Sequence, residues 1–292
     1  MANASGSNPF MDFIHWLASL FSSKPAQLPP LTMPRKVMVI VFRPLGPNYQ
    51  ARSAPWSDPN TLAAGYIAKM SAVSGNRLSY QVSVTQTGNY FPVLKDGRRY
   101  DDNTWAQAMA DDSKAFRDPV SHQYELADYG RILADFNVLQ AVKDGSIDEV
   151  WLFGGPLFGF PESCMVGKSA FWCNGDPIQA DSRRFVVMGF NYERSVREMV
   201  HDYGHRVESL LAAQFGSIAF LGAMYPKNLA DNAPLPQAAA FPAPKNAFEQ
   251  FLLDHGTVHR TIGGMAYSQD EAAWLAALQP DWWPATIDPN RI

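Results

Sequence analysis

The sequence predicts an α/β or α+β fold built around a mixed, twisted sheet. Segments rich in β-branched residues, typical of strands, alternate along the chain with segments whose apolar residues recur at helical spacing. The chain has 292 residues and is 47% hydrophobic, which is ample for a core without covalent cross-links. Such alternation is typical of sheets covered by helices.

The first predicted elements lie in the N-terminal third of the chain. The segment Lys36–Leu45 is a β-branched run bounded by proline, which predicts a buried strand. Leu62–Ser74 has helical spacing, and Arg77–Thr87 alternates polar and apolar residues as a half-exposed strand does. We therefore expect a strand, a helix and a second strand in this order.

The central part of the chain continues the alternation. Two helical patterns cover residues 100–112 and 126–146, and a glycine ends the second. Strands are predicted at Asp148–Pro156 and Arg183–Phe190, and a loop rich in glycine, proline and aromatic residues is predicted from Gly154 to Asp181. Beyond a further helix, the remaining segments are a long loop at Tyr225–Pro244 and ordered structure at residues 245–265 and 270–284.

The first 34 residues are expected to lie outside the domain. The apolar run from Phe10 to Phe21 predicts a short amphipathic helix, and a proline-rich linker follows at Lys24–Pro34. The run lacks a basic flank and is too short to cross a bilayer, so we expect neither a signal peptide nor a transmembrane helix. Location stays open, and secretion remains an option if a native signal peptide has been removed.

Charge and cysteine content narrow the classes of partner. The formal net charge is −4 and only 18% of residues are charged, so the sequence predicts no nucleic-acid partner and no stable membrane insertion. Cys164 and Cys173 are the only cysteines; a disulfide and two buried thiols both fit their spacing, whereas a CxxC metal site does not. The sequence does not indicate the oligomeric state.

One predicted helix carries two histidines at metal-ligand spacing. Ser195 and Glu198 match a capping box, so the helix is expected to begin near Ser195 and to end at about Phe215. Its apolar residues form one face toward the core, and the opposite side carries a polar stripe. The stripe consists of Arg194, Glu198, His201, His205 and Glu208.

Two interpretations of this stripe remain open. It fits an ordinary solvated helix face with charge pairs at i, i+3 and i, i+4. It also fits a metal site, because two imidazoles one turn apart, such as His201 and His205, project in parallel and can bind one ion. Asp202 after the first histidine, and Gly204 as a costly residue inside a helix, favour the metal site.

The sequence "HDYGH" resembles the H-E-x-x-H motif of zincin-like metallopeptidases, with Asp202 in place of the usual glutamate. The resemblance implies a zincin-like fold in which the metal-binding helix follows a mixed sheet. It also implies Zn²⁺ as cofactor, His201 and His205 as ligands and Asp202 as general base. Metzincins continue with glycine and a third histidine, but Glu208 and Leu211 occupy those positions here.

A catalytic zinc needs a third protein ligand, and four residues are candidates. Glu208 lies on the same helix, and Glu249 is similar in position to the second-helix glutamate of gluzincins. His255 and His259 flank a Gly-Thr-Val segment that predicts a strand or turn, so only one of them is expected to reach the site. We select His259.

Together these observations predict a metal-dependent hydrolase that acts on a peptide or another small polymer. Residues 35–292 would form its single catalytic domain, with a C-terminal subdomain from about residue 225 as an option. The alternative is a noncatalytic module that binds carbohydrate or another ligand through the aromatic loop containing "WLFGGPLFGF" and "SAFWCNG".

Overall fold

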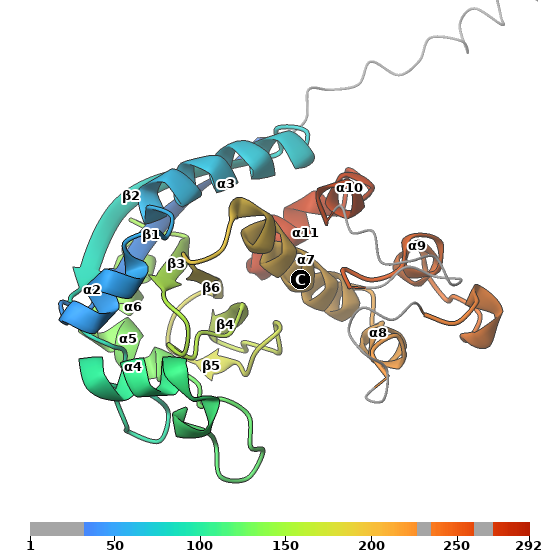
Figure 1. Ribbon diagram of the computed structural model, residues 1–292. Helices are drawn as coiled ribbons and strands as arrows, with labels where there is room; N and C mark the ends of the chain where they lie inside the picture. The colour runs from blue at the N-terminus through green and yellow to red at the C-terminus, as the bar shows by residue number, and fades with distance from the viewer. Residues whose placement is uncertain (1–31, 227–234, 260–270) are drawn as a thin grey trace, which may run out of the picture. The chain divides into compact units, whose positions relative to one another are not determined.

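A six-stranded mixed sheet with the order β2-β1-β3-β6-β4-β5 forms the centre of the computed structural model (Figure 1). Strand β1 is parallel to β2 and β3, and β3 is parallel to β6. Strand β4 is antiparallel to β6 and parallel to the short edge strand β5. The predicted mixed α/β architecture is confirmed at this level. The strands are β1 (Met33–Phe42), β2 (Leu78–Gly88), β3 (Glu149–Gly154), β4 (Ser163–Gly167), β5 (Ile178–Gln179) and β6 (Phe185–Asn191).

The structure describes residues 32–226, 235–259 and 271–292, and Thr32–Ile292 form one compact unit. The predicted helix at Phe10–Phe21 and the proline-rich linker lie outside the described residues, apart from the end of the linker. That residues 35–292 form a single catalytic domain, with a C-terminal subdomain from about residue 225 as an option, stays a prediction.

Burial along the strands matches their positions in the sheet. All six residues of β3 are buried, as expected for a parallel strand with helices on both faces. The edge strand β2 alternates between buried and exposed residues over its first half, in agreement with the predicted half-exposed strand. The core therefore centres on β1, β3 and β6.

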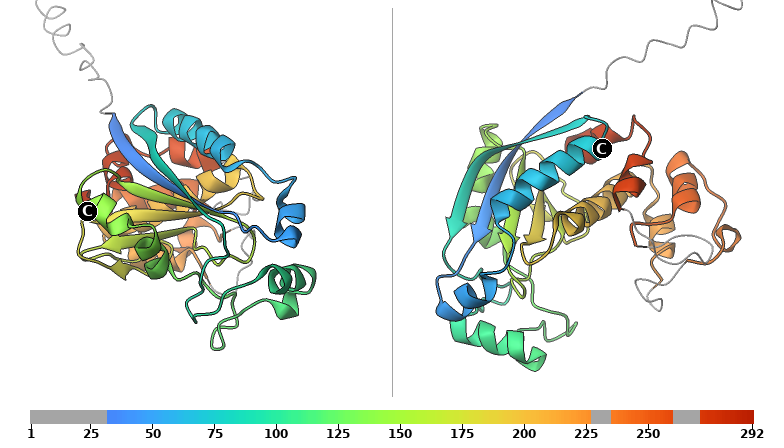
Figure 2. Two further views of the ribbon diagram at one scale, coloured as in Figure 1. Left: turned by 90° about the vertical axis from the view of Figure 1, so that its left-hand side faces the viewer. Right: turned by 45° about the horizontal axis from the view of Figure 1, so that its top comes forward.

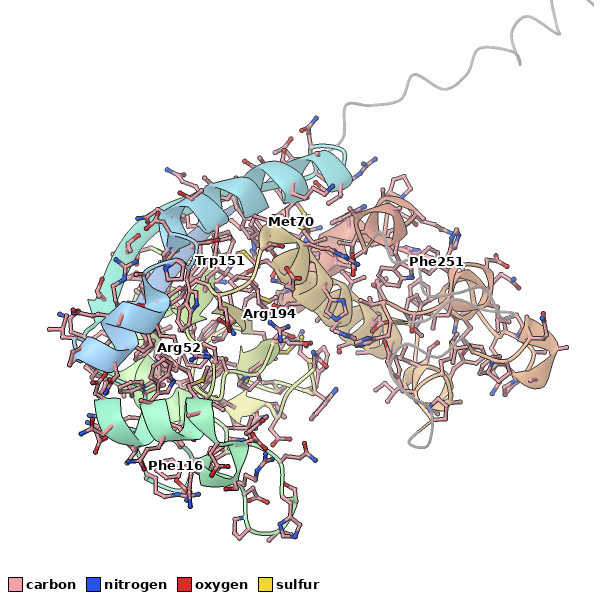
Figure 3. The ribbon with its side chains drawn as sticks, viewed as in Figure 1. Arg52, Met70, Phe116, Trp151, Arg194 and Phe251 are labelled. Atoms are coloured by element: carbon pink, nitrogen blue, oxygen red, sulfur yellow. The ribbon has the colours of Figure 1, made fainter. Side chains whose placement is uncertain are left out.

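Helices cover both faces of the sheet (Figure 2). On one face, Tyr66 of α3 packs edge-on against Trp151 of β3, whose side chain lies in the interior (Figure 3). On the other face, Phe42 of β1 packs against Phe136 at the end of α5. The helices of the first two thirds of the chain are α2 (Pro47–Ser53), α3 (Pro59–Val73), α4 (Asp102–Ala110), α5 (Tyr129–Asp135) and α6 (Val138–Lys143), with a 3₁₀ turn at Asp112–Lys114.

Helix α7 (Val196–Gln214) follows β6 and anchors the rest of the chain. Helices α8, α10 and α11 pack along it, and α9 contacts α8. The remaining elements are α8 (Ile218–Ala223), α9 (Ala247–His255), α10 (Glu271–Ala276) and α11 (Trp283–Ile287), with 3₁₀ turns at Ala238–Ala240 and Pro289–Arg291. Among the described residues, no helix is both long and apolar enough to span a bilayer.

Two predictions of secondary structure were wrong in detail. The helix predicted at residues 126–146 is two helices, because Asn137 adopts a left-handed conformation with φ 53° and interrupts the chain of helical hydrogen bonds. The loop predicted at Gly154–Asp181 contains β4 and β5, whose short lengths and flanking glycine and proline obscure the strand pattern.

The two cysteines are free and buried, which decides between the two options left open by the sequence. Burial raises the pKa of the Cys164 thiol to about 12 and that of Cys173 to about 11. Both thiols therefore stay protonated at neutral pH and behave as small apolar side chains.

Candidate metal centre

Helix α7 begins where the sequence predicts it. Ser195 caps its N-terminus, and the Glu198 carboxylate accepts a hydrogen bond from the Ser195 backbone N–H at 3.1 Å, which completes the capping box. The buried Arg206 guanidinium forms an ion pair with Glu149 at 2.7 Å and ties the middle of the helix to the start of β3. These contacts fix the helix that carries the two histidines.

The structure brings His201 and His205 of α7 together with His259. Their ring centroids lie 4.6–4.8 Å apart in the three pairs. One candidate ligand atom from each residue lies within 4.8 Å of the others, and the Nε2 atoms of His205 and His259 are 2.8 Å apart. Ligand nitrogens around a tetrahedral zinc lie about 3.3 Å apart, so small side-chain movements suffice for all three to bind one ion.

Glu208 orients the central ring of this cluster. Its Oε2 lies 3.0 Å from His205 Nδ1 and accepts the ring N–H, which leaves the Nε2 lone pair facing the other two rings. Glu208 also accepts hydrogen bonds from the Tyr225 hydroxyl and from the backbone N–H of Val258. Carboxylates that hold the outer nitrogen of a histidine in this way are typical of metal sites.

A second carboxylate lies beside His201. Glu271 of α10 places Oε1 3.6 Å from His201 Nδ1 and is also paired with Arg197, which is 3.2 Å away. Burial lowers the pKa of His201 and of His259 below the usual 6.5, and the neighbouring ring of His205 lowers both further. Neutral imidazole, the form that binds metal, is therefore favoured at the cluster.

Close packing against Gly204 holds the third histidine near the helix. A Cβ atom at Gly204 would lie 2.7 Å from Cγ2 of Val258, closer than real Cβ contacts allow. The preceding Gly256 ends α9 with φ 77°, which a side chain would strain. The glycine inside α7 therefore has a packing reason: it admits the segment that leads to His259.

The other three candidates for the third ligand serve different roles. Glu208 contacts His205 from outside the cluster. Glu249 is buried and accepts hydrogen bonds from the Ser217 hydroxyl and the Lys245 backbone. His255 is exposed and lies against Phe251, with ring centroids 4.5 Å apart.

The polar stripe of α7 is not a solvated surface, so that interpretation was wrong for its central residues. His205 is 7% exposed and Glu208 is 2% exposed. The segment around Val258 covers this side of the helix, and the apolar residues of the helix are buried as well. The helix is consequently buried on two sides, and its ionisable groups pair with one another.

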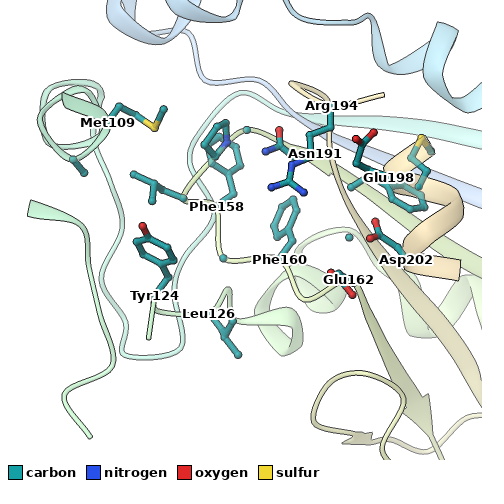
Figure 4. A pocket seen from close by; sticks show the side chains of 18 of the residues that line it. Met109, Tyr124, Leu126, Phe158, Phe160, Glu162, Asn191, Arg194, Glu198 and Asp202 are labelled. Atoms are coloured by element: carbon teal, nitrogen blue, oxygen red, sulfur yellow. The ribbon is translucent and has the colours of Figure 1, made fainter. Parts of the chain in front are cut away.

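A cavity of about 730 Å³ lies beside helix α7 (Figure 4), and none of the three histidines is among the described residues that line it. Asp202 and Glu162 line it, and Glu162 Oε2 lies 3.9 Å from His205 Nε2. The carboxyl of Asp202 is almost fully buried, and burial, followed by the charge of Glu162, raises its pKa well above the usual 3.8. Apolar residues form much of the remaining wall; they include Met109, Leu126, Leu157, Phe158 and Phe160.

The aromatic loop of the alternative hypothesis belongs partly to this wall and partly to the core. Phe158 is buried and packs against Phe91 and Tyr49. Trp172 is 58% exposed and lies elsewhere on the loop. The loop therefore lines a cavity more than it presents an open aromatic surface.

Sequence reasoning missed two residues that the structure places at the cluster. Glu162 comes directly before β4 and is not among the candidate residues named from the sequence. Glu271 lies 70 residues beyond His201 in sequence, and no local pattern links the two. Neither had a signal in the sequence, because both are brought to the site by tertiary contacts.

Comparison with known protein families finds no family model that matches the chain, and comparison with curated proteins finds no significantly similar sequence.

Proposed function

We propose that this protein is a zinc-dependent hydrolase related in its site to zincin-like metallopeptidases. His201, His205 and His259 would hold the ion. The observation that carries the proposal is the convergence of three imidazoles, the central one held by Glu208 through its other nitrogen. Three protein ligands with one open position are typical of catalytic zinc rather than structural zinc.

Zinc in such a site supplies a Lewis acid and lowers the pKa of a bound water to about 7. The chain must add a carboxylate that takes the proton of the attacking water. The motif assigns this role to Asp202, although no hydrogen bond or ion pair joins the Asp202 side chain to the three rings within the described residues. The cavity beside helix α7, with Phe158 and Phe160 in its wall, fits a peptide with an apolar side chain.

Metal content tests the proposal directly. The purified protein is expected to carry about one zinc per chain, and His201→Ala, His205→Ala and His259→Ala are each expected to lose it. His255→Ala is the matched control and should retain zinc, because this ring lies against Phe251, outside the cluster. A folded wild-type protein without affinity for zinc would contradict the proposal and favour the noncatalytic module.

A library of peptides tests the reaction. Zinc-loaded protein is expected to cleave peptides with a large apolar residue beside the scissile bond, to lose activity with a chelator and to regain it with zinc. If the zinc-loaded protein cleaves no peptide, the metal site stands but the peptidase assignment does not.

A further inference from the structure

Glu162 lies close to the histidine cluster. It precedes β4, and its Oε2 lies 3.9 Å from His205 Nε2, the nitrogen that points toward the other two rings. The Glu162 side chain is 42% exposed, compared with 9% for His205, so the glutamate lies on the open side of the cluster. It also lines the cavity beside helix α7 (Figure 4).

Glu162 is not one of the three residues whose ligand atoms gather within 4.8 Å of one another, although its Oε2 lies 3.9 Å from His205 Nε2. We therefore place its carboxylate beside the candidate ion and not among the ligands. If the three rings held an ion, a water bound to it would be the group that this carboxylate could reach.

A chain of hydrogen bonds connects Glu162 to the same helix. The Asn174 side-chain amide donates to Glu162 Oε2. The Asn174 backbone N–H donates to the Ser209 hydroxyl at 3.2 Å, which itself donates to the His205 carbonyl at 3.0 Å. Asn174 has φ 51°, a left-handed conformation that asparagine tolerates better than most residues. These hydrogen bonds therefore fix the position of Glu162 relative to the helical turn that carries His205.

We propose that Glu162 is the catalytic carboxylate of this site, an inference that rests on the zinc hydrolase proposed above. Its Oε2 accepts a proton from the attacking water as the water oxygen bonds to the substrate carbonyl carbon. The same proton passes to the leaving nitrogen as the C–N bond breaks, so the step needs no further reactant. Asp202, whose carboxyl is buried, then acts as part of the cavity wall.

Acetohydroxamate is a suitable probe, because it binds zinc in the open position and shares its hydroxyl proton with the carboxylate that faces this position. Binding is measured on zinc-loaded protein by calorimetry and needs no known substrate. Glu162→Gln is expected to retain one zinc per chain within a few-fold of wild-type affinity, and to lose acetohydroxamate affinity about tenfold or more. Peptide hydrolysis should fall about 10²- to 10⁴-fold.

Matched variants separate this role from alternatives. The exposed control Glu193→Gln is expected to bind acetohydroxamate like the wild type, and Asp202→Asn is expected to lose less affinity than Glu162→Gln. Asn174→Gly removes the side chain that holds Glu162, keeps the backbone conformation and is expected to cause a partial loss. In Glu162→Ala, added formate should restore part of the hydrolysis by replacing the missing carboxylate.

Three results would overturn the assignment in distinguishable ways. Loss of zinc in Glu162→Gln would make Glu162 a ligand. Loss of acetohydroxamate affinity in Asp202→Asn, but not in Glu162→Gln, would return the role to Asp202. A wild-type protein that binds no zinc would instead refute the zinc hydrolase itself, before any variant is compared.

Discussion

The Nδ1 atom of His205 lies 3.0 Å from Oε2 of Glu208, and the carboxylate also accepts hydrogen bonds from Tyr225 and Val258. An amide in its place has one oxygen where the carboxylate has two, so Glu208→Gln must weaken or break at least one of these three hydrogen bonds. We expect zinc affinity to fall about 10- to 100-fold and stability to fall by about 1–3 kcal/mol. Competition with a chromophoric chelator and urea unfolding measure the two effects. Unchanged zinc affinity would contradict the orienting role, and Glu193→Gln serves as the exposed control.

Gly204→Ala tests the contact that holds the segment before His259. Alanine would favour the helix by about 1 kcal/mol, but its Cβ would lie 2.7 Å from Val258 Cγ2. Overpacking of this kind costs about 1–3 kcal/mol, so we expect a net loss of stability together with weaker zinc binding. Adding Val258→Ala should recover part of the zinc affinity. Gly222→Ala in α8 meets nothing within 4 Å and should be neutral or slightly stabilising.

The metal-free protein is expected to lose stability as the pH falls below 6.5. The folded-state pKa values of His201 and His259 are lowered, chiefly by burial, so the unfolded chain takes up protons at a pH where the folded chain does not. The loss of stability from these two groups is complete once the pH has fallen below their folded-state pKa values. Urea unfolding in chelator at pH 7.5 and 5.5 should show a smaller decrease for His259→Asn than for the wild type. Equal decreases would show that this ring does not contribute.

Zinc affinity should follow the same ionisations. Because the lowered pKa values keep His201 and His259 neutral below pH 6.5, the plateau of zinc affinity is expected to extend below that pH. Titrations with zinc at a series of pH values give the plateau and its lower limit. A decline that begins above pH 6.5 would contradict the directions of these pKa shifts.

Glu149→Gln is expected to destabilise the fold by about 3–5 kcal/mol, because it leaves the Arg206 guanidinium charged and buried without its partner. The Glu149 carboxylate also accepts hydrogen bonds from Tyr80 and Trp151. Urea unfolding measures the loss. Asp181→Asn removes an ion pair whose aspartate is 99% exposed and should leave the midpoint unchanged.

The buried thiols should react only after unfolding. The pKa values of Cys164 and Cys173 are raised to about 12 and about 11 by burial, so little thiolate is present at pH 8. Iodoacetamide should therefore label the native protein slowly and add two labels per chain in denaturant without reductant. Labelling that requires a reductant would show a disulfide instead.

The parts of the site that the sequence predicts are those set by local signals. The capping box at Ser195 and Glu198 places the start of α7, and the four-residue interval of His201 and His205 places two rings on one side of it. Both features depend only on helical geometry, which the sequence expresses directly.

The position of His259 has a nonlocal origin. Its candidacy followed from the turn expected at Gly256, which separates it from His255. Its actual approach to the helix depends on the contact between Gly204 and Val258, which no periodicity reveals. Glu162 and Glu271 reach the cluster in the same nonlocal way.

The burial of the polar side of helix α7 could not be predicted from the sequence pattern either. A polar stripe opposite an apolar face predicts exposure to solvent, yet Glu208 is buried because it forms hydrogen bonds with Tyr225 and Val258 from later in the chain. Elsewhere in the fold, the left-handed Asn137 between α5 and α6 and the five-residue strand β4 were not predicted, because each differs from its surroundings over too few residues.

The separation of 54 positions between His205 and His259 in the sequence imposes an order on assembly during synthesis. Helix α7 leaves the ribosome with two of the three rings, and the third follows only when His259 has been translated. If the proposed zinc site holds an ion, the complete set of ligands forms only after that point.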